Sequence, residues 1–364
     1  MVAVPGPDDP RQDHPGGAQP PRRVLTRRLA AAVAVALLAW ILIVAIEDRR
    51  GPDAKSLPGP PLKSLASPRY VGTAVDGLAL DREPGYRTVL AEEFSSVTPE
   101  NAMKWGVIEP QPGKFAWGDA DAIVDFARDH GQRVRGHTLV WHSQNPAWLE
   151  GLEGGALRRA IREHIGAVVG RYRGRVGDWD VVNEPLRDDG TLRPQRYMRK
   201  ELIAAAFRWA HDVDPRARLW LNEIGAEEIG PKSDALYALV RELRTAGVPV
   251  DGVGFQGHFS LKGVPPTFRQ NVARFAALGV RVALTELDVA VPLPESDAER
   301  ARQAAIYRQA IADCAACVGV TVWGFTDRHS WIPSNQQGMG AATLLDGDLR
   351  AKPAYTALAS ALRR

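Results

Sequence analysis

Short apolar runs alternate with amphipathic stretches from Tyr70 to near the end of the chain. The runs have the length and the Val and Leu content of strands buried in a parallel sheet. In the stretches between them apolar residues recur at helical spacing, as at Leu202, Ala206 and Trp209. The expected strands are Tyr70–Val75, Phe94–Val97, Arg133–Val140, Asp178–Asn183, Arg218–Asn222, Gly252–Gln256, Val280–Thr285 and Val320–Phe325. The expected helices include Ala120–His130, Ala156–Tyr172, Lys200–Asp212, Ser233–Ala246, Thr267–Leu278 and Ala298–Ala312. Eight such repeats predict an α/β fold of the (β/α)8 TIM-barrel type over residues 68–364.

The first 67 residues differ from the rest of the chain. Residues 1–28 are rich in Pro, Gly and Asp and predict a disordered tail on the cytoplasmic side. Residues 29–46 form an uninterrupted apolar run of 18 residues. At about 1.5 Å per residue this run spans roughly the hydrocarbon core of a bilayer. Residues 47–67 contain several prolines and predict a short, semi-stiff linker.

The apolar run has two readings. A cleavable signal peptide has an apolar region of about 7–15 residues and a small residue just before the cut. Here the run is longer and ends Val44-Ala45-Ile46-Glu47, without that small residue. We therefore expect a single uncleaved transmembrane helix, a signal anchor, with secretion after signal cleavage as the alternative.

Charge argues against a nucleic-acid partner. The formal net charge of +3 comes from the amino-terminal segment, because residues 68–364 hold 37 basic and 37 acidic residues. Proteins that bind nucleic acid normally carry a basic patch, and a neutral domain provides no electrostatic basis for one. Lys and Arg flank the apolar run on both sides, so they do not decide its orientation.

Two of the expected strands end on a glutamate. Glu184 follows the run Trp179–Asn183, and Glu286 follows the run Val282–Thr285. In a barrel the chemistry lies where the strands finish, and two carboxylates facing one cleft are the minimum needed to cleave a glycosidic bond. The alternative is that each glutamate pairs with an arginine at its strand end. Two such glutamates, with Asn183 before one and Asp288 after the other, favour a glycoside hydrolase.

Further polar and aromatic residues fall at the same strand ends. They are Glu100, Asn101, Lys104, His137, Trp141, Gln144, Gln256, His258, Trp323 and Trp331. Singly, each histidine is more typical of a hydrogen-bonded core residue, and each tryptophan of the core. In a closed barrel, however, all of these side chains converge on one mouth. Hydroxyl-binding groups together with indoles suit a sugar, whose ring has flat apolar faces.

The sequence lacks the motifs that are typical of other enzyme classes. We find no Gly-rich phosphate loop, no Gly-x-Ser-x-Gly elbow and no Walker-type lysine in the sequence. The two cysteines, Cys314 and Cys317, are too few for a four-ligand zinc site, and we expect a local disulfide between them. No metal and no cofactor is expected.

At the level of motifs the chain resembles glycoside hydrolase family 10, the retaining endo-β-1,4-xylanases. The resemblance runs from Tyr70 to about Tyr355. Its motifs are Phe94-Ser-Ser-Val-Thr-Pro-Glu-Asn-Ala-Met-Lys-Trp105, Gly136-His-Thr-Leu-Val-Trp-His-Ser-Gln144, Trp179–Pro185, Thr285–Asp288 and Val322–Asp327.

The resemblance implies roles for the candidate residues. Glu184 is the expected acid/base and Glu286 the expected nucleophile, oriented by His258 and Asp288. Asn183 is expected to donate to the 2-hydroxyl of the reacting sugar, which His137, Trp141, Gln256, His258 and Trp323 would surround. The next sugar would be bound by Glu100, Asn101, Lys104, Gln144 and Trp331.

The retaining mechanism predicts two properties of the carboxyl groups of Glu184 and Glu286. They should stand about 5–5.5 Å apart, and the charge of Glu286 should raise the pKa of Glu184. The partner is then xylan or xylo-oligosaccharide, which places the barrel outside the cell on a monomeric, single-pass membrane protein.

Three departures from the family pattern affect the leaving-group side. Ile224 stands where a tyrosine is expected, Gly257 lies between Gln256 and His258, and the stretch after Thr191 is shorter than usual. They leave open a same-fold β-glycanase that acts on β-glucosides or short oligosaccharides. The other alternative, a catalytically weak membrane-anchored glycan-binding protein, is disfavoured by the intact Glu184 and Glu286.

Overall fold

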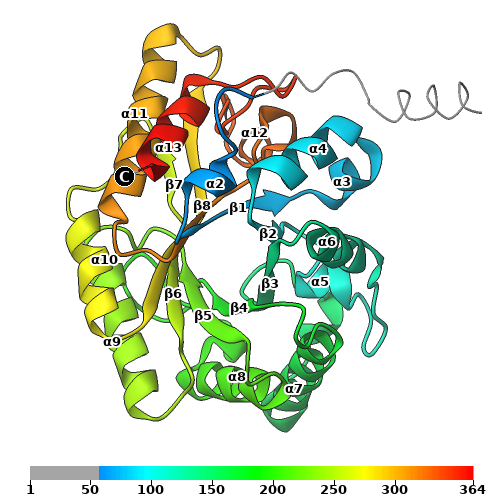
Figure 1. Cartoon of the computed structure of the whole chain (residues 1–364). Coiled ribbons are helices and arrows are strands. Elements are labelled where there is room, and N and C mark those ends of the chain that lie inside the picture. The colour runs from blue at the N-terminus through cyan, green and yellow to red at the C-terminus, as the bar shows by residue number, and fades with distance from the viewer. Residues whose placement is uncertain (1–56, 364) are drawn as a thin grey trace, which may run out of the picture. The chain divides into compact units, whose positions relative to one another are not determined.

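The computed structural model describes residues 57–363, and these form a closed barrel of parallel strands (Figure 1). The barrel strands are β1 (Tyr70–Val75), β2 (Ser96–Pro99), β3 (Arg133–Trp141), β4 (Asp178–Asn183), β5 (Arg218–Glu223), β6 (Gly252–Phe255), β8 (Arg281–Pro292) and β9 (Gly319–Val322). Each strand pairs in parallel with the next, and β9 pairs with β1 to close the ring. The predicted eight-stranded α/β barrel is confirmed.

The expected tail (residues 1–28), the expected anchor (29–46) and residues 47–56 of the expected linker lie outside the described residues. Within residues 57–363, none of the helices has the length and apolar character needed to cross a membrane.

Six helices cover the outside of the barrel close to where periodicity predicts them. They are α6 (Gly118–Asp129), α7 (Gly154–Arg171), α8 (Lys200–Val213), α9 (Pro231–Thr245), α10 (Phe268–Ala277) and α11 (Asp297–Asp313). The first strand is followed by α3 (Gly77–Arg82) and α4 (Pro84–Glu93), and the described chain ends in α13 (Pro353–Leu362). Shorter helical turns are α2 (Leu62–Leu65), α5 (Trp105–Ile108) and α12 (Ile332–Asn335).

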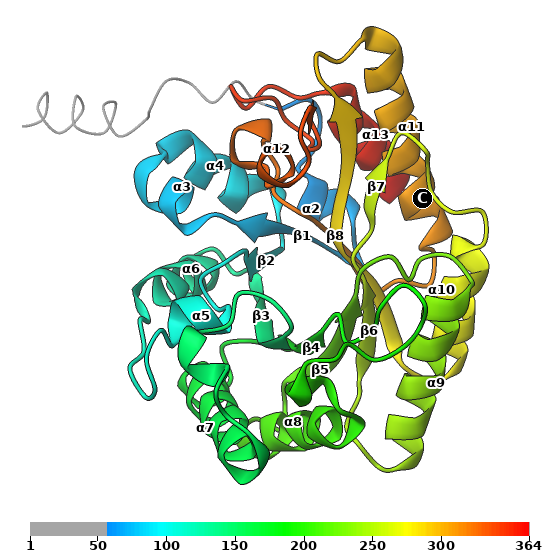
Figure 2. The ribbon, with the colours of Figure 1, turned by 180° about the vertical axis from the view of Figure 1, so that it is seen from behind.

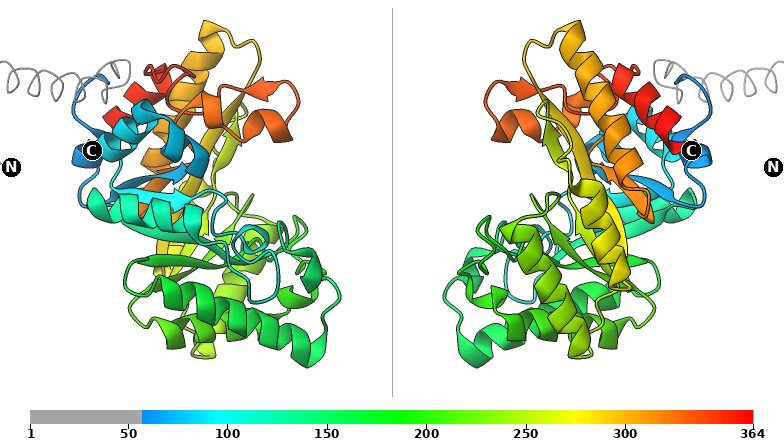
Figure 3. Two further views of the ribbon diagram at one scale, coloured as in Figure 1. Left: turned by 90° about the vertical axis from the view of Figure 1, so that its right-hand side faces the viewer. Right: turned by 90° about the vertical axis from the view of Figure 1, so that its left-hand side faces the viewer.

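Strand β8 continues past the rim of the barrel. Its outer half pairs in parallel with β7 (His258–Ser260) and antiparallel with β10 (Met339–Gly340). Figure 2 shows β7 beside this extension, and in Figure 3 the orange segment with α12 and β10 projects from the barrel. The extension builds one wall of the barrel mouth.

Three strand predictions were wrong at their ends, and one of them is β8, which was expected to end at Thr285 but continues to Pro292. The second strand was expected at Phe94–Val97, but Phe94 caps α4 and is buried against Phe325, with 5.5 Å between ring centres. The last strand was expected to reach Phe325, but β9 ends at Val322 because Gly324 has a φ of +80°, which an extended strand does not allow.

At two positions in the barrel, a tryptophan ring on one strand leaves room only for glycine on the next strand. Trp179 on β4 lies over Gly136 of β3, and Trp220 on β5 lies over Gly252 of β6. A Cβ atom at Gly136 would stand 2.2 Å from the Trp179 ring, and one at Gly252 would stand 2.3 Å from the Trp220 ring. Any larger residue at these two glycines would displace the indole.

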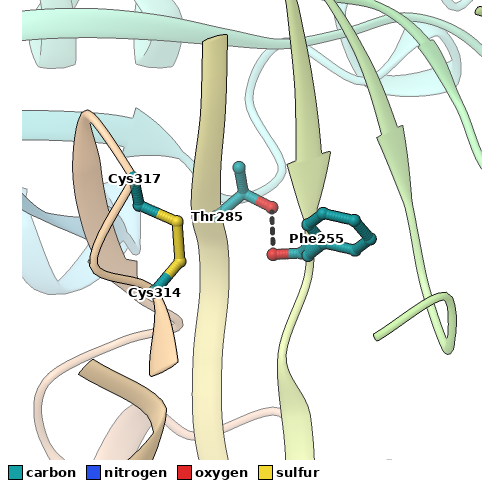
Figure 4. The surroundings of a disulfide bond; sticks show 4 residues. All are labelled: Phe255, Thr285, Cys314 and Cys317. Carbon is teal, nitrogen blue, oxygen red and sulfur yellow. Dashed lines mark hydrogen bonds between the residues drawn. A yellow bond between two sulfur atoms is a disulfide. The ribbon is translucent and has the colours of Figure 1, made fainter. Parts of the chain in front are cut away.

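The expected disulfide is present. Cys314, which caps the end of α11, is bonded to Cys317, which precedes β9 (Figure 4). Both side chains are buried. The bond closes the tight connection between the last barrel helix and the last barrel strand.

Candidate active site

The two glutamates singled out by the sequence lie at the barrel mouth on two strands separated by β5 and β6. Glu184 directly follows β4, and Glu286 lies within β8. Both are buried, and each main chain is tied to a neighbouring strand: the N–H of Glu184 donates to Asn222 O at 2.8 Å and that of Glu286 to Gln256 O at 2.8 Å. Their positions are therefore set by the barrel itself.

Glu184 sits on a sharp turn. Its φ is +52°, in the left-handed region that non-glycine residues seldom adopt. The Nε of Arg193 donates to the Glu184 carbonyl at 2.9 Å, and the Nη2 of Arg193 lies 3.9 Å from Glu184 Oε2. Two residues on, Leu186 N–H donates to Oε2 of the buried Glu223 at 3.1 Å. These contacts hold the chain after β4 in its strained conformation.

Three side-chain amides join the two carboxylates into one hydrogen-bonded cluster. The Nδ2 of Asn222 donates to Glu286 Oε1 at 2.7 Å and to Asn183 Oδ1 at 2.9 Å. The Nε2 of Gln256 donates to Glu184 Oε1 at 2.9 Å. Both glutamates therefore face the same cleft, each fixed by an amide from the second strand along the barrel.

Asn222, at the end of β5, was not among the candidate residues. Its Oδ1 accepts the hydroxyl of Thr285 at 2.6 Å, which leaves the Nδ2 to donate toward Glu286 and Asn183. The same hydroxyl lies 3.2 Å from Phe255 O, the contact drawn beside the disulfide in Figure 4. Asn222 carries an amide at the end of a third expected strand, and this position could have identified it as a site residue.

The surroundings of Glu184 contradict the expectation that its pKa is raised. Burial raises the pKa, but hydrogen bonds from His142 and Gln256 outweigh burial and bring the pKa of Glu184 to about 2. The Nε2 of His142 lies 2.7 Å from Glu184 Oε2. His142 lies in the motif Gly136–Gln144 but was not predicted to be a site residue. Its proximity to Glu184 arises only because β3 and β4 lie side by side in the barrel.

A buried chain of groups supports Glu286 from the other side. His258 Nε2 lies 3.2 Å from Glu286 Oε2, and its Nδ1 lies 3.0 Å from Asp288 Oδ1. The Nε1 of Trp331 donates to Asp288 Oδ2 at 2.7 Å. Burial lowers the pKa of His258, but Asp288 and Glu286 outweigh burial and raise it to about 10. His258 is thus a cation held between the side chains of Glu286 and Asp288.

His137 and Trp323 form the base of the mouth. The Nδ1 of His137 lies 3.0 Å from Asp180 Oδ2, and Asp180 is also paired with the buried Arg135. The ring of His137 meets the Trp323 ring edge to face, with 5.2 Å between centres. His137 is therefore a buried, hydrogen-bonded histidine, and its other edge lies against an indole of the mouth.

Residues after β2 and β3 form a polar wall. The Nζ of Lys104 donates to Asn101 Oδ1 at 3.0 Å and lies 4.9 Å from the ring centre of Trp141. Burial lowers the pKa of Lys104 despite Glu286 and Glu100 nearby, and burial raises the pKa of Glu100 to about 7. Gln144 is exposed and stands farther out, with a φ of +50°.

The departures from the family pattern lie around the same mouth. Ile224 directly follows β5 and is half-buried. Gly257 has a φ of +75°, and its N–H donates to Glu227 Oε1 at 2.8 Å; a Cβ there would stand 2.7 Å from Leu284 Cδ2. Glycine is therefore required at 257 by the main chain and by the packing in this protein.

The arrangement brings two carboxylates of different character to one cleft. Glu286 is held by an amide and a histidine cation, and Glu184 is held by an amide and has a second histidine at its Oε2. Indoles and hydroxyl-binding groups surround both. Such a site is equipped to attack a sugar from one face and to exchange a proton with the departing oxygen.

Comparison with known proteins agrees with this geometry. The family model described as Glycosyl hydrolase family 10 matches residues 62–361. An endo-1,4-beta-xylanase from Agaricus bisporus is 41% identical over 300 residues, covering 80% of this chain and 90% of the relative. Endo-1,4-beta-xylanase B from Thermotoga neapolitana is 40% identical over 283 residues, covering 75% and 82%. The crystal structure of xylanase 10B from Thermotoga petrophila RKU-1 in complex with xylobiose superposes with a TM-score of 0.81 at 39% identity, covering 84% of this chain and 98% of that one.

Proposed function

The chain belongs to glycosyl hydrolase family 10, and on that premise we propose how it works as an endo-1,4-β-xylanase. It is a glycoside hydrolase, and its substrate is xylan or xylo-oligosaccharide. We assign the nucleophile to Glu286 and the acid/base to Glu184, acting by double displacement with retention of configuration. The observation that carries this assignment is the pair of buried carboxylates after β4 and within β8, joined by Asn183, Asn222 and Gln256.

In the first step the Glu286 carboxylate attacks the anomeric carbon of a xylose unit. The bond from that carbon to the glycosidic oxygen breaks, and Glu184 gives its proton to this oxygen. The fragment that carries the new hydroxyl leaves, and the xylosyl unit remains as an ester on Glu286. In the second step Glu184 removes a proton from water, whose oxygen attacks the same carbon and displaces Glu286.

The contacts of the two carboxylates bear on these roles in different ways. The Nδ2 of Asn222 donates to one oxygen of Glu286, and His258 lies 3.2 Å from the other, so the carboxyl group is held in a fixed orientation for attack. Glu184 has His142 and Gln256 at hydrogen-bond distance, and these contacts favour its charged form before substrate arrives. Binding of a sugar beside Glu184 excludes water, which disfavours its charged form and raises the pKa of the carboxyl group toward the protonated state that proton delivery requires.

The remaining candidates take places around the sugar. Asn183 donates to the 2-hydroxyl of the reacting unit, a bond that strengthens as positive charge develops on the ring. The wall of Lys104 and Asn101 binds the preceding unit, and Trp331 offers an indole face from the extension of β8. The xylobiose complex of the Thermotoga petrophila enzyme supports a cleft of this kind.

We further propose that residues 29–46 anchor the protein in the cell membrane as a single span. The support is the length of the apolar run and the missing cleavage site. The catalytic domain then lies outside the cell, where a polymer that cannot cross a membrane is accessible. We propose a monomer, because one barrel holds every group the reaction uses.

Product analysis on three substrates tests the function. Hydrolysis of xylan to short xylo-oligosaccharides, with an early fall in viscosity and β-configured products by NMR, is the expected result. Preferential hydrolysis of cellulose-derived oligosaccharides or aryl β-glucosides would instead support the same-fold β-glycanase. Binding of xylan without hydrolysis would support the glycan-binding protein.

A further inference from the structure

The chain turns sharply just after β4, and this turn sets the direction of the proposed acid/base. Glu184, the first residue past the strand, has a φ of +52°. The next residue is Pro185, which has no main-chain N–H. Leu186 therefore carries the first main-chain N–H after Glu184 that can hold the turn. The group that accepts this N–H helps to decide how firmly the turn is fixed.

That acceptor is the side chain of Glu223, the last residue of β5. Its Oε2 accepts the N–H of Leu186 at 3.1 Å, and its Oε1 accepts the N–H of Ile224 at 3.2 Å. Successive side chains of a strand point to opposite faces. Because Asn222 points into the cleft and donates to Glu286, Glu223 points away from the cleft, where it is fully buried. Glu223 thus contacts the turn without lining the cleft.

A buried lysine contacts both Glu223 and the segment after the turn. The Nζ of Lys232, in the first turn of α9, lies 3.4 Å from Glu223 Oε1 and donates to Asp188 Oδ1 at 3.1 Å. The side chain of Lys232 is only 6% exposed, whereas that of Asp188 is 99% exposed. Lys232 therefore connects Glu223 to a second residue that follows Glu184.

The loop of residues 186–192 packs closely on the start of α9. Gly190 has a φ of +84°, and a Cβ atom there would stand 2.7 Å from Pro231 O. Leu186 and Leu192 form an antiparallel bridge that closes the loop. The loop therefore rests on the same helix that carries Lys232, and Glu223 lies where this loop, β5 and α9 meet.

Stability alone does not account for the pair of Glu223 and Lys232. The helix dipole disfavours a cation in the first turn of a helix. Burial of two ionisable groups costs free energy that their attraction often does not recover, and apolar residues of similar volume can replace such pairs without loss of stability. The hydrogen bond from Leu186 to Glu223 is what apolar residues could not supply.

We propose that Glu223 is a positioning residue for the acid/base: through the N–H of Leu186 it fixes the turn that aims the Glu184 carboxyl group at the glycosidic oxygen. This inference rests on the proposed function. Asn183 precedes the turn and is paired with Asn222 in the barrel. Loss of the Glu223 acceptor should therefore misplace Glu184 without moving the groups that hold the reacting sugar.

The test compares two double variants that differ in the acceptor. Both contain Lys232→Met, so that neither leaves a buried lysine beside an altered partner. Glu223→Gln keeps an oxygen that can accept the Leu186 N–H, whereas Glu223→Met has nearly the same length and removes it. Burial raises the pKa of Glu223 to about 8, although Lys232 lowers it. At pH 6, glutamine therefore has the same charge as the native side chain.

Two substrates separate proton delivery from other effects. Hydrolysis of xylohexaose needs the proton of Glu184, whereas formation of the intermediate from a 2,4-dinitrophenyl xylobioside does not. For xylohexaose we expect kcat/KM to fall about thirtyfold in Glu223→Met/Lys232→Met, because a misplacement of about 1 Å can cost about a hundredfold. In Glu223→Gln/Lys232→Met the fall should be at most about threefold. For the dinitrophenyl substrate, kcat/KM should stay within about twofold of the native value in both variants.

Two further variants serve as control and reference. Glu93 is also a buried carboxyl group that accepts a main-chain N–H, from Leu62 at 2.9 Å, but it lies at the end of α4. Glu93→Met should lower the free energy of unfolding and leave both kcat/KM values unchanged at a temperature where the variant is folded. Glu184→Ala should show the same selective loss on xylohexaose, with a larger size.

Three results would overturn the proposal. They are an equal loss on both substrates in Glu223→Met/Lys232→Met, a loss as large in the glutamine variant as in the methionine variant, and no loss in either. If the methionine variant does not fold, Glu223→Asp decides, because it keeps the carboxyl group but shortens its reach, and the same selective loss is expected. A native enzyme that does not hydrolyse xylohexaose overturns the proposed function, and an unselective loss in Glu184→Ala overturns the role of Glu184.

Discussion

The Nε2 of His142 lies 2.7 Å from Oε2 of Glu184, while Gln256 donates to the other oxygen of the same carboxyl group. Both oxygens of the proposed acid/base are therefore hydrogen-bonded before any substrate binds. This arrangement favours the charged form of Glu184 in the free protein, because hydrogen bonds to a carboxylate lower its pKa. Glu184 is thus held by two residues that follow different strands of the barrel, β3 and β6.

Replacing His142 should raise the pKa of Glu184. Hydrogen bonds to the charged form lower a carboxyl pKa, so their loss leaves burial, which acts in the opposite direction. In His142→Phe we expect the Glu184 titration, followed by 13C NMR of labelled glutamate carboxyl groups, to move up from about 2. Activity on xylan should fall more than activity on aryl glycosides with good leaving groups.

The matched control is His130→Phe. His130 also makes one hydrogen bond, to Phe126 O at 2.8 Å, but it lies at the end of α6, away from the carboxylates. It should leave the Glu184 titration and both activities unchanged. An unshifted Glu184 titration in His142→Phe would contradict the assigned cause.

The folded protein should lose stability as pH rises through the titration of His258. The pKa of His258 is raised to about 10, above the unfolded value of about 6.5. Its cation therefore contributes stability that is fully present below about 6.5 and is lost as pH rises toward 10. The free energy of unfolding, measured by denaturant between pH 6 and 10, should decline in the native protein. In His258→Gln the decline should be much smaller; an equal decline in both proteins would exclude His258 as its source.

Much of this molecule could be predicted from local sequence. The barrel follows from strands and helices whose periodicities are visible within short windows. Glu184 and Glu286 stand out because a polar residue ending a buried run must lie at the mouth. Neither inference required any knowledge of which segments meet in space.

The interactions that were missed depend on contacts between distant segments. His142 and Glu184 are 42 residues apart, and Asn222 and Glu286 are 64 residues apart. The sign of the Glu184 pKa shift was wrong for the same reason: repulsion from Glu286 was foreseen, but the hydrogen bond from His142 was not. Predicted strand ends were also wrong where the backbone conformation of a single residue ends the strand, as at Gly324.

Restoring an aromatic side chain after β5 should strengthen binding on the leaving-group side. A ring at position 224 can stack on a sugar, a contact worth about 1 kcal/mol. Ile224→Tyr should therefore lower KM for longer xylo-oligosaccharides several-fold. Hydrolysis of an aryl xylobioside, which does not reach that subsite, serves as the control. Equal changes for both substrates would mean that residue 224 does not contact the leaving-group sugar.

The apolar run at 29–46 should keep the full-length protein in the membrane fraction. An uncleaved span resists extraction by salt or carbonate, whereas a secreted enzyme remains in the medium. Protease added to intact cells should release the barrel. A soluble form whose amino terminus begins near residue 47 would show that the run is a cleaved signal peptide instead.

The central claim, that Glu286 forms the covalent intermediate and Glu184 exchanges the proton, is tested most directly by azide rescue. Glu184→Ala should still form the intermediate from an aryl xylobioside whose leaving group needs no proton, and it should then stall. Added azide should restore turnover by attacking the intermediate and give a β-xylobiosyl azide, because two inversions retain configuration. Glu286→Ala should give no β-configured azide. An α-configured azide from Glu184→Ala, or a β-configured azide from Glu286→Ala, would contradict the assignment of the two roles.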